Sequence, residues 1–179
     1  MVTTPIGAPV AMVHCNNCTS DINAWVELFS QFAAAMGMDA EKGTIFSLLF
    51  NMALEGDPDC GDLVSFNYYS GEHITGFNEG RPLFLRHPNS KFTLPNFMRT
   101  HLLSAIAALK IGLDILTGEE HVVIDKIYAH GGFFKTPCVG QRMLSAAVNA
   151  PVTVMETAGE GGPCGMALLT AYSLWKQDG

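Results

Sequence analysis

The segment YAHGGFFKTPCVGQ, from Tyr128 to Gln141, joins a strand-like run to a helix-like run through two adjacent glycines. Glycine can adopt positive φ angles, and it lets a ligand approach the main chain with no Cβ in the way. The helix that follows presents free N–H groups and the positive end of its dipole, which suit a phosphate or the polar atoms of a nucleotide. The pattern therefore predicts either a nucleotide-binding turn at Gly131 and Gly132 or an ordinary turn between a strand and a helix.

Strand-like and helix-like runs alternate along the chain, which predicts an α/β fold with helices packed on a sheet. We expect Thr19, Ser20 or Asp21 to cap the first helix, and Thr136 and Pro137 to begin the fourth. The expected strands are residues 9–14, 63–69, 81–86, 122–129 and 151–156, and the expected helices are residues 22–37, 39–56, 99–116, 138–150 and 164–175.

The chain has 179 residues, of which 48% are hydrophobic, and this is enough for one substantial core. We expect a flexible lead-in over residues 1–7 and a single domain over residues 8–179. The net charge of −7 argues against a nucleic acid partner. No apolar run reaches the length that spans a bilayer, and no signal peptide precedes the first strand, so we expect no membrane partner and a cytoplasmic location.

The five cysteines are scattered along the chain, which favours reduced and mostly buried thiols. Cys15 and Cys18 lie in HCNNC and could form half of a zinc site. A structural zinc site normally has two clustered pairs of ligands, and no second pair follows here. The sequence therefore favours thiols over a metal site.

Several acidic and aromatic residues have structural interpretations that compete with catalytic ones. Asp21 is expected to cap a helix, Glu72 to order a loop and Asp125 to lie solvated on a strand. Trp25 and Trp175 lie on apolar helix faces and are expected in the core. None of these residues is predicted to be catalytic.

Five segments resemble, in order, the C-terminal domain of the FGGY carbohydrate kinases, the family of xylulokinase, ribulokinase and glycerol kinase. HCNNCTSDINAWVELF resembles the opening joint of that domain, FNYYSGEH its PYLSGER, and GPCGMALLTAY its GALGAALLAA. FMRTHLLSAIAALKIGLDIL is similar to HTRAHLARAVLEGIAFGLRD, with Arg99 at the arginine position. GGFFKTPCVGQRMLSAAVNAPV resembles the adenosine-binding stretch of the family.

The resemblance implies a set of nucleotide-binding positions. Phe133 stands where xylulokinases often have a third glycine, and Ser20 and Asn23 occupy the opening joint, where a glycine and a polar residue usually line the nucleotide site. The implied positions are Gly131, Gly132, Phe133, Lys135, Thr136, Gln141, Ser20 and Asn23.

The resemblance also implies an actin-like ATPase domain with a ribonuclease H-like core, in which helices pack on a central mixed sheet. In this family ATP lies between two domains, and the other domain supplies the sugar site, a phosphate loop, the Mg²⁺ ligands and the aspartate base. Because 179 residues are too few for both domains, we expect the nucleotide-binding half of a kinase for a ketose or polyol such as xylulose or ribulose. Its partner would be its own N-terminal domain, and alone it would be inactive.

An alternative is a non-catalytic sensor or interaction module that keeps the fold without binding ATP. Phe133 and the lack of a glycine near Ser20 motivate this alternative. A corner filled by Phe133 or Phe134 would favour it. In either case an uncovered apolar wall could drive self-association into a homo-oligomer.

Overall fold

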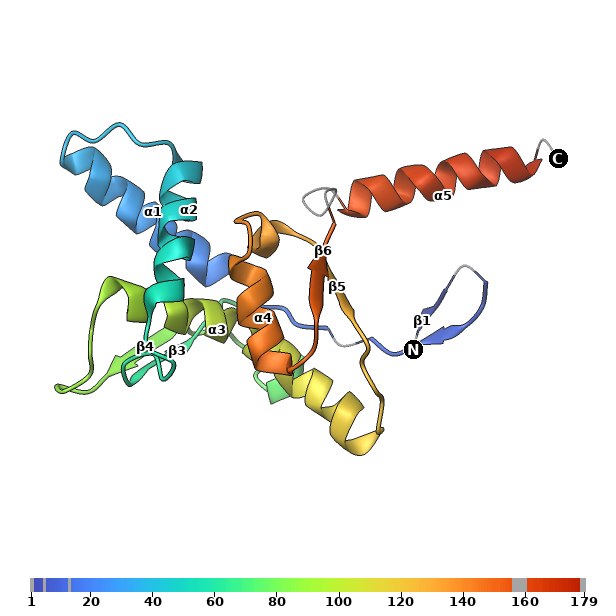
Figure 1. The fold of residues 1–179 in the computed structure, drawn as a ribbon, viewed down its shortest axis with the longest axis horizontal. Helices are drawn as coiled ribbons and strands as arrows, with labels where there is room; N and C mark the ends of the chain where they lie inside the picture. The colour runs from blue at the N-terminus through green and yellow to red at the C-terminus, as the bar shows by residue number, and fades with distance from the viewer. Residues whose placement is uncertain (1, 5, 13, 156–160, 178–179) are drawn as a thin grey trace. The chain divides into compact units, whose positions relative to one another are not determined.

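The computed structural model describes residues 2–4, 6–12, 14–155 and 161–177 (Figure 1). The chain divides into two compact units, Met1–Val123 and Ile124–Gly179, and each is described by itself below. The single domain expected over residues 8–179 stays a prediction.

α-Helices and an antiparallel strand pair form most of the first unit. In the strand pair, Leu63 lies opposite Arg86 and Phe66 lies opposite Leu83. The elements are α1 (Ser20–Ala35), α2 (Lys42–Met52) with the 3₁₀ turn η1 (Ala53–Glu55), β3 (Leu63–Phe66), the 3₁₀ turn η2 (His73–Thr75), β4 (Leu83–Arg86) and α3 (Leu94–Asp114).

The first residues form a short hairpin in which β1 (Val2–Thr3) pairs with β2 (Pro9–Val10). Both residues of β2 are exposed. The strand predicted over residues 9–14 is therefore shorter and more exposed than its apolar sequence suggested. An isolated two-stranded hairpin is only marginally stable in water, because it has little apolar surface to bury.

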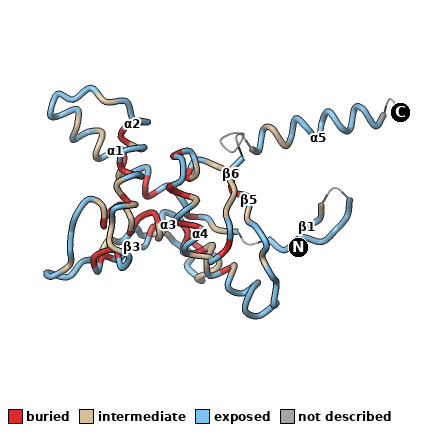
Figure 2. Tube along the Cα trace, in the orientation of Figure 1, coloured by how far each residue is buried: buried red, intermediate tan, exposed pale blue. Residues whose placement is uncertain are grey.

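Helix α3 carries the core of the first unit, and Figure 2 shows buried residues along it. Met98 and Leu102 are fully buried, and Ala105 and Ile106 continue the same apolar face. The helix begins at Leu94, earlier than predicted, because Thr93 caps it and proline is tolerated in a first helical turn. It continues into the π-helix η3 (Ile115–Glu119).

The first turn of α3 is tied to the loop that follows η1. The Asn96 side chain is buried, and its Oδ1 accepts a hydrogen bond from the Asp57 N–H at 2.7 Å. Its Nδ2 donates to Asp57 Oδ2 at 3.1 Å and to the Lys91 carbonyl at 2.9 Å. The hydrogen bond from Asn96, with a further contribution from Lys91, lowers the pKa of Asp57. These contacts fix the start of the core helix.

The run Leu94–Glu119 contains 26 residues, and an 18-residue window within it has a mean hydropathy of 1.4. By length and composition alone it could cross a membrane, which corrects the expectation that no run reaches that length. The fully buried Met98 and Leu102 are also typical of the core helix of a compact unit. The absence of a membrane partner stays a prediction.

The second unit contains a strand–helix–strand arrangement. β5 (Ile127–Ala129) runs parallel to β6 (Val152–Val154), and α4 (Val139–Val148) lies between them in the chain. A parallel pair needs such a crossover. Met143 and Leu144 of α4 are buried.

The C-terminal helix α5 (Gly161–Gln177) confirms the predicted helix but not its burial. Trp175 is 74% exposed, and Met166 and Leu168 are also exposed. The prediction that Trp175 lies in the core is therefore wrong, because no described element covers this face of α5.

The α/β class is confirmed, but the described residues do not contain the expected central mixed sheet. The pairs β1–β2, β3–β4 and β5–β6 form three separate sheets in this part of the chain. Each strand has only two to four residues, and no described strand pairs with more than one other.

Candidate functional site

The glycine turn follows β5 and has the conformation that its sequence predicted. Gly131 has φ 105° and ψ 177°, a region that residues with a side chain rarely adopt. A Cβ placed on Gly131 or Gly132 would meet no atom within 4 Å, so this side of the turn is open. The Phe134 N–H donates to the Gly131 carbonyl at 3.1 Å and closes the 3₁₀ turn η4 (Gly132–Phe134).

Phe133 and Phe134 pack on the α4 side of the turn. Phe133 is only 3% exposed, and the two rings meet edge-to-face with their centroids 5.3 Å apart. A Cβ on Gly140 of α4 would lie 2.7 Å from the Phe133 carbonyl and 2.9 Å from Phe134 Cδ1, so this contact needs a glycine. The phenylalanines therefore anchor the turn to α4 and leave the side chain positions of Gly131 and Gly132 uncovered.

The start of α4 differs from the prediction. Cys138, not Thr136 or Pro137, is the N-cap, and it has a positive φ of 67°. The Cys138 N–H donates to Gln141 Oε1 at 3.0 Å, and the Cys138 side chain accepts from the Gln141 N–H. This capping box pairs two N–H groups at the start of the helix. Fewer N–H groups are therefore free for a phosphate than the sequence suggested.

The remaining predicted residues of this segment keep unused polar groups. Thr136 is 3% exposed, and its hydroxyl has no hydrogen bond to any residue that the structure describes. Lys135 is exposed and forms no ion pair within the described ranges. Gln141 is half-buried, and because its Oε1 accepts from Cys138, the amide Nε2 is the group left to donate.

Ser20 and Asn23 lie at the start of α1, in the first unit, and both are exposed. The structure therefore places six predicted residues in one segment of the second unit and these two in the first. Asp21, between them, does not cap the helix. It is buried, and its Oδ2 lies 3.0 Å from His101 Nδ1 and accepts from Trp25 Nε1 at 3.2 Å.

Half-buried Ser65 completes a Ser–His–Asp group that has no catalytic geometry. Ser65 Oγ lies 3.1 Å from His101 Nδ1, the same nitrogen that faces Asp21. A catalytic triad uses the two ring nitrogens for different partners. Nε2 of His101 is buried without a partner in the described part of the chain. The group therefore belongs to the core.

Glu72 and Asn17 form a second buried polar group, which we call the Glu72 clamp. The Glu72 carboxylate is 0% exposed and accepts from the Asn16 N–H at 3.0 Å, the Asn17 N–H at 3.1 Å and Asn17 Nδ2 at 3.2 Å. Asn17 Oδ1 accepts from the Tyr69 N–H at 2.8 Å and the Ser70 N–H at 3.0 Å. The prediction that Glu72 orders a loop is confirmed, whereas no local pattern in the sequence pointed to Asn17.

Cys15 and Cys18, which flank Asn16 and Asn17 of the Glu72 clamp, are free thiols. Burial raises the pKa of both, and nearby Glu72 raises the pKa of Cys15 further. Within the described ranges, no group of three or more His, Cys, Asp or Glu side chains could hold a metal ion. Asp125 is exposed and precedes β5.

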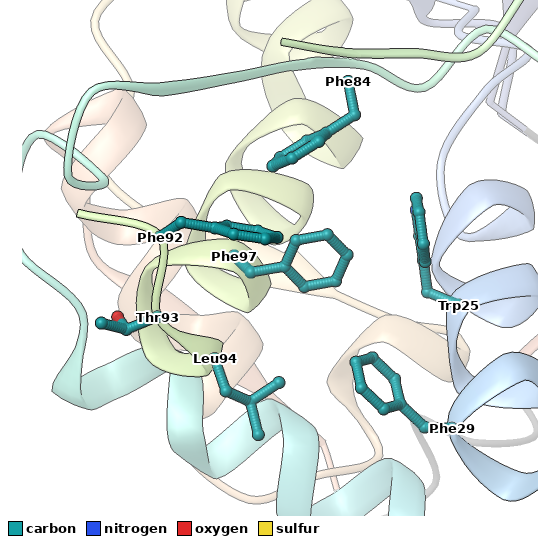
Figure 3. Close-up of a pocket in the computed structure, with 7 residues that line it drawn as sticks. All are labelled: Trp25, Phe29, Phe84, Phe92, Thr93, Leu94 and Phe97. Carbon is teal, nitrogen blue, oxygen red and sulfur yellow. The ribbon is translucent and has the colours of Figure 1, made fainter. Parts of the chain in front are cut away.

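An aromatic cavity of about 330 Å³ opens in the first unit (Figure 3). Trp25 and Phe29 of α1 lie across from Phe97 of α3. Thr93 contributes the only side chain oxygen among its lining residues, and that oxygen already accepts from the Asn96 N–H at the cap of α3. The cavity contains none of the predicted site residues. Its lining residues are Trp25, Phe29, Phe84, Phe92, Thr93, Leu94 and Phe97.

A family model matches residues 1–174, and its description is the C-terminal domain of the FGGY family of carbohydrate kinases. No curated protein matches the sequence significantly.

Solved structures with the same fold include three xylulose kinases. That from Lactobacillus acidophilus, described as ligand-bound, has a TM-score of 0.60 and 18% identity, over 90% of this chain and 32% of its own. That from Bifidobacterium adolescentis has a TM-score of 0.56 and 18% identity, over 80% of this chain and 25% of its own. That from Rhodospirillum rubrum has a TM-score of 0.55 and 17% identity, over 74% of this chain and 25% of its own. The chain thus spans a quarter to a third of the length of these proteins.

Proposed function

The chain belongs to the FGGY family of carbohydrate kinases, whose C-terminal domain it carries, and from that premise we propose that it is the nucleotide-binding half of an ATP-dependent sugar kinase. The match over residues 1–174 is the observation on which this proposal rests. The fold shared with xylulose kinases supports a ketose or polyol, such as xylulose or ribulose, as the acceptor. The domain is then an actin-like ATPase domain of the ribonuclease H-like type.

The other parts of the kinase follow from this assignment. ATP would lie between this chain and the N-terminal domain of the same kinase. That domain would hold Mg²⁺, because no described group of side chains here suits a metal ion. We place the protein in the cytoplasm, with no nucleic acid or membrane partner and with self-association through uncovered apolar surface.

The residues at the glycine turn suit a nucleotide. ATP would supply the phosphoryl group. Its polar atoms need hydrogen-bond partners, and this chain would bind and orient the nucleotide. The open side of Gly131 and Gly132 admits a ligand to the main chain. The unpaired Thr136 hydroxyl and the Gln141 amide would donate to it, and Lys135 would contribute positive charge near the phosphates.

ADP binding to the ¹⁵N-labelled chain, measured by chemical shifts with and without Mg²⁺, tests the proposal. We expect saturable shifts over residues 131–136. Thr136→Val keeps the shape of the side chain and should weaken ADP binding by roughly fivefold, because it removes one hydrogen bond of about 1 kcal/mol.

Thr170→Val is the matched control, because the Thr170 hydroxyl is exposed on α5 and donates to the Met166 carbonyl. It should leave ADP binding unchanged. No saturable binding at millimolar ADP would contradict the proposal and favour the sensor or interaction module.

A further inference from the structure

The aromatic cavity of the first unit has no part in the proposed function. Its volume is about 330 Å³, and five of its seven lining residues are aromatic (Figure 3). Protein interiors are normally packed without voids of this size, because rings that surround open space lose the contacts that fill a core. Ligand pockets, in contrast, begin at about 300 Å³ and are lined mainly by apolar and aromatic side chains. The cavity therefore has the size and the lining of a small-molecule site.

Phe97 connects the rings that line the cavity. It is buried, and its ring meets the Trp25 ring edge-to-face, with the centroids 4.8 Å apart and the planes at 90°. It meets the Phe84 ring in the same way, with the centroids 5.2 Å apart. Phe29 and Phe92 also contact it edge-to-face, each with a centroid distance of 6.1 Å. Because one buried ring contacts the four others, the wall is held together without a ligand.

The buried Asp21–His101 pair stabilises the same wall. Asp21 Oδ2 accepts a hydrogen bond from Trp25 Nε1 at 3.2 Å and lies 3.0 Å from His101 Nδ1. The His101 ring stacks on the Phe84 ring at 5.5 Å and meets the Phe97 ring edge-to-face at 4.4 Å. Three of the lining rings thus contact one buried polar group, which fixes their orientation before a ligand binds. Such preorganisation lowers the ordering cost of binding.

The chemistry of the lining favours an uncharged ligand. None of the seven lining residues carries a charge. The Thr93 oxygen accepts from the Asn96 N–H, so the hydroxyl proton of Thr93 is the group left to donate to a ligand. A cationic ligand is disfavoured, because the Arg86 guanidinium already lies over the Phe92 ring, 4.8 Å from its centroid.

We propose that this cavity binds a small, flat, uncharged aromatic molecule of about two fused rings. An apolar cavity of roughly 150 Å³ holds one benzene ring, and the cavity here has about twice that volume. Aromatic rings that meet edge-to-face or in offset stacks gain free energy beyond the area that they bury, so a flat aromatic ligand is preferred over a puckered aliphatic one of equal size. All seven lining residues lie in the first unit, so this inference is independent of the proposed nucleotide site.

Titration of 2-naphthol into the ¹⁵N-labelled chain, with decahydro-2-naphthol as the matched aliphatic probe, tests the proposal. The two tryptophans give separate readouts, because Trp25 lines the cavity and Trp175 lies on α5. We expect 2-naphthol to shift the Trp25 indole resonance saturably and to leave the Trp175 resonance unchanged. Decahydro-2-naphthol should bind roughly two- to tenfold more weakly. Equal binding of the two probes, or equal shifts of both tryptophans, would overturn the proposal.

Leu94→Trp tests the site by filling it, and Leu48→Trp is the matched control. Leu94 lines the cavity at the first residue of α3 and is exposed, so a larger side chain there can enter the open volume. Leu48 is exposed on α2 and does not line the cavity. We expect Leu94→Trp to weaken 2-naphthol binding by roughly tenfold or more and Leu48→Trp to leave it unchanged. Unchanged binding to Leu94→Trp would contradict the assignment of the site.

Leu94→Trp could prevent folding, so measurements on the wild-type chain accompany it. We expect intermolecular nuclear Overhauser effects between 2-naphthol and the rings of Trp25, Phe29 and Phe97, and effects confined to other residues would overturn the proposal. Tetramethylammonium should not shift the Trp25 resonance, and a saturable shift would show a site for cations instead. Dilution of the ligand-free chain should also leave this resonance unchanged. A shift on dilution would show that a second copy of the chain occupies the cavity, which would overturn the proposal as well.

Discussion

Gly131 shows how one residue defines the shape of the candidate site. Its φ of 105° and ψ of 177° lie in a region open essentially to glycine alone. Gly131→Ala should therefore lower the free energy of unfolding by about 1–3 kcal/mol, although the added Cβ would contact no neighbouring atom. Urea unfolding followed by circular dichroism measures this change.

The neighbouring glycine gives a matched control for that experiment. Gly132 has equally open space around its Cβ position, but its φ is not in the positive region. Gly132→Ala should be neutral or slightly stabilising, because alanine restricts the unfolded chain. Equal effects of the two substitutions would contradict the conformational explanation.

At the scale of elements, the contribution of Gln141 to the capping box of α4 can be measured without a ligand, as a change in stability. Gln141→Ala removes the acceptor of the Cys138 N–H and should destabilise the second unit by about 1 kcal/mol. Gln141→Glu keeps an acceptor and places a negative charge near the positive end of the helix, so it should be as stable as wild type or more so. Thermal unfolding followed by circular dichroism tests this predicted order of stability among the two variants and the wild type. A Gln141→Glu variant as unstable as Gln141→Ala would contradict the capping role.

The elements also show what the sequence could predict. Apolar periodicity is a local pattern and predicts the helices, and Leu102 and Ile106 of α3 are buried as expected. Helix starts were harder to predict: α4 is capped by Cys138 and Gln141, and its cap depends on a side chain that reaches back one turn. The strands are shorter than predicted, because their lengths depend on partners elsewhere in the chain.

The candidate site also contains features that the sequence could predict and features that it could not. The turn at Gly131 was predictable, because two glycines before a helix are a local signal. The pairing of Asp21 with His101 and of Glu72 with Asn17 joins residues far apart in the chain, and no spacing rule reveals such pairs. The prediction that Asp21 caps α1 is therefore wrong, because its carboxylate pairs with His101 and Trp25.

At the scale of the whole molecule, the proposed function assigns this chain nucleotide binding and leaves the other parts of phosphoryl transfer to another domain. The chain folds as two compact units, and it spans only a quarter to a third of the xylulose kinases that share its fold. Phosphoryl transfer depends on a positioned acceptor, a base and charge stabilisation of the moving group. The described residues offer a turn suited to a nucleotide but no group of ligands for a metal ion.

The proposed function predicts that the isolated chain binds nucleotide without transferring phosphate. With ATP, Mg²⁺ and xylulose or ribulose, it should release no sugar-dependent ADP above a blank, since loss of the general base alone costs about 10²- to 10⁴-fold in rate. A coupled assay for ADP measures this, and the binding experiment on the same preparation shows that the chain is folded. Sugar-dependent ADP release that copurifies with the chain and falls in Gly131→Ala would contradict the prediction. It would mean that the acceptor site and the base lie within these 179 residues.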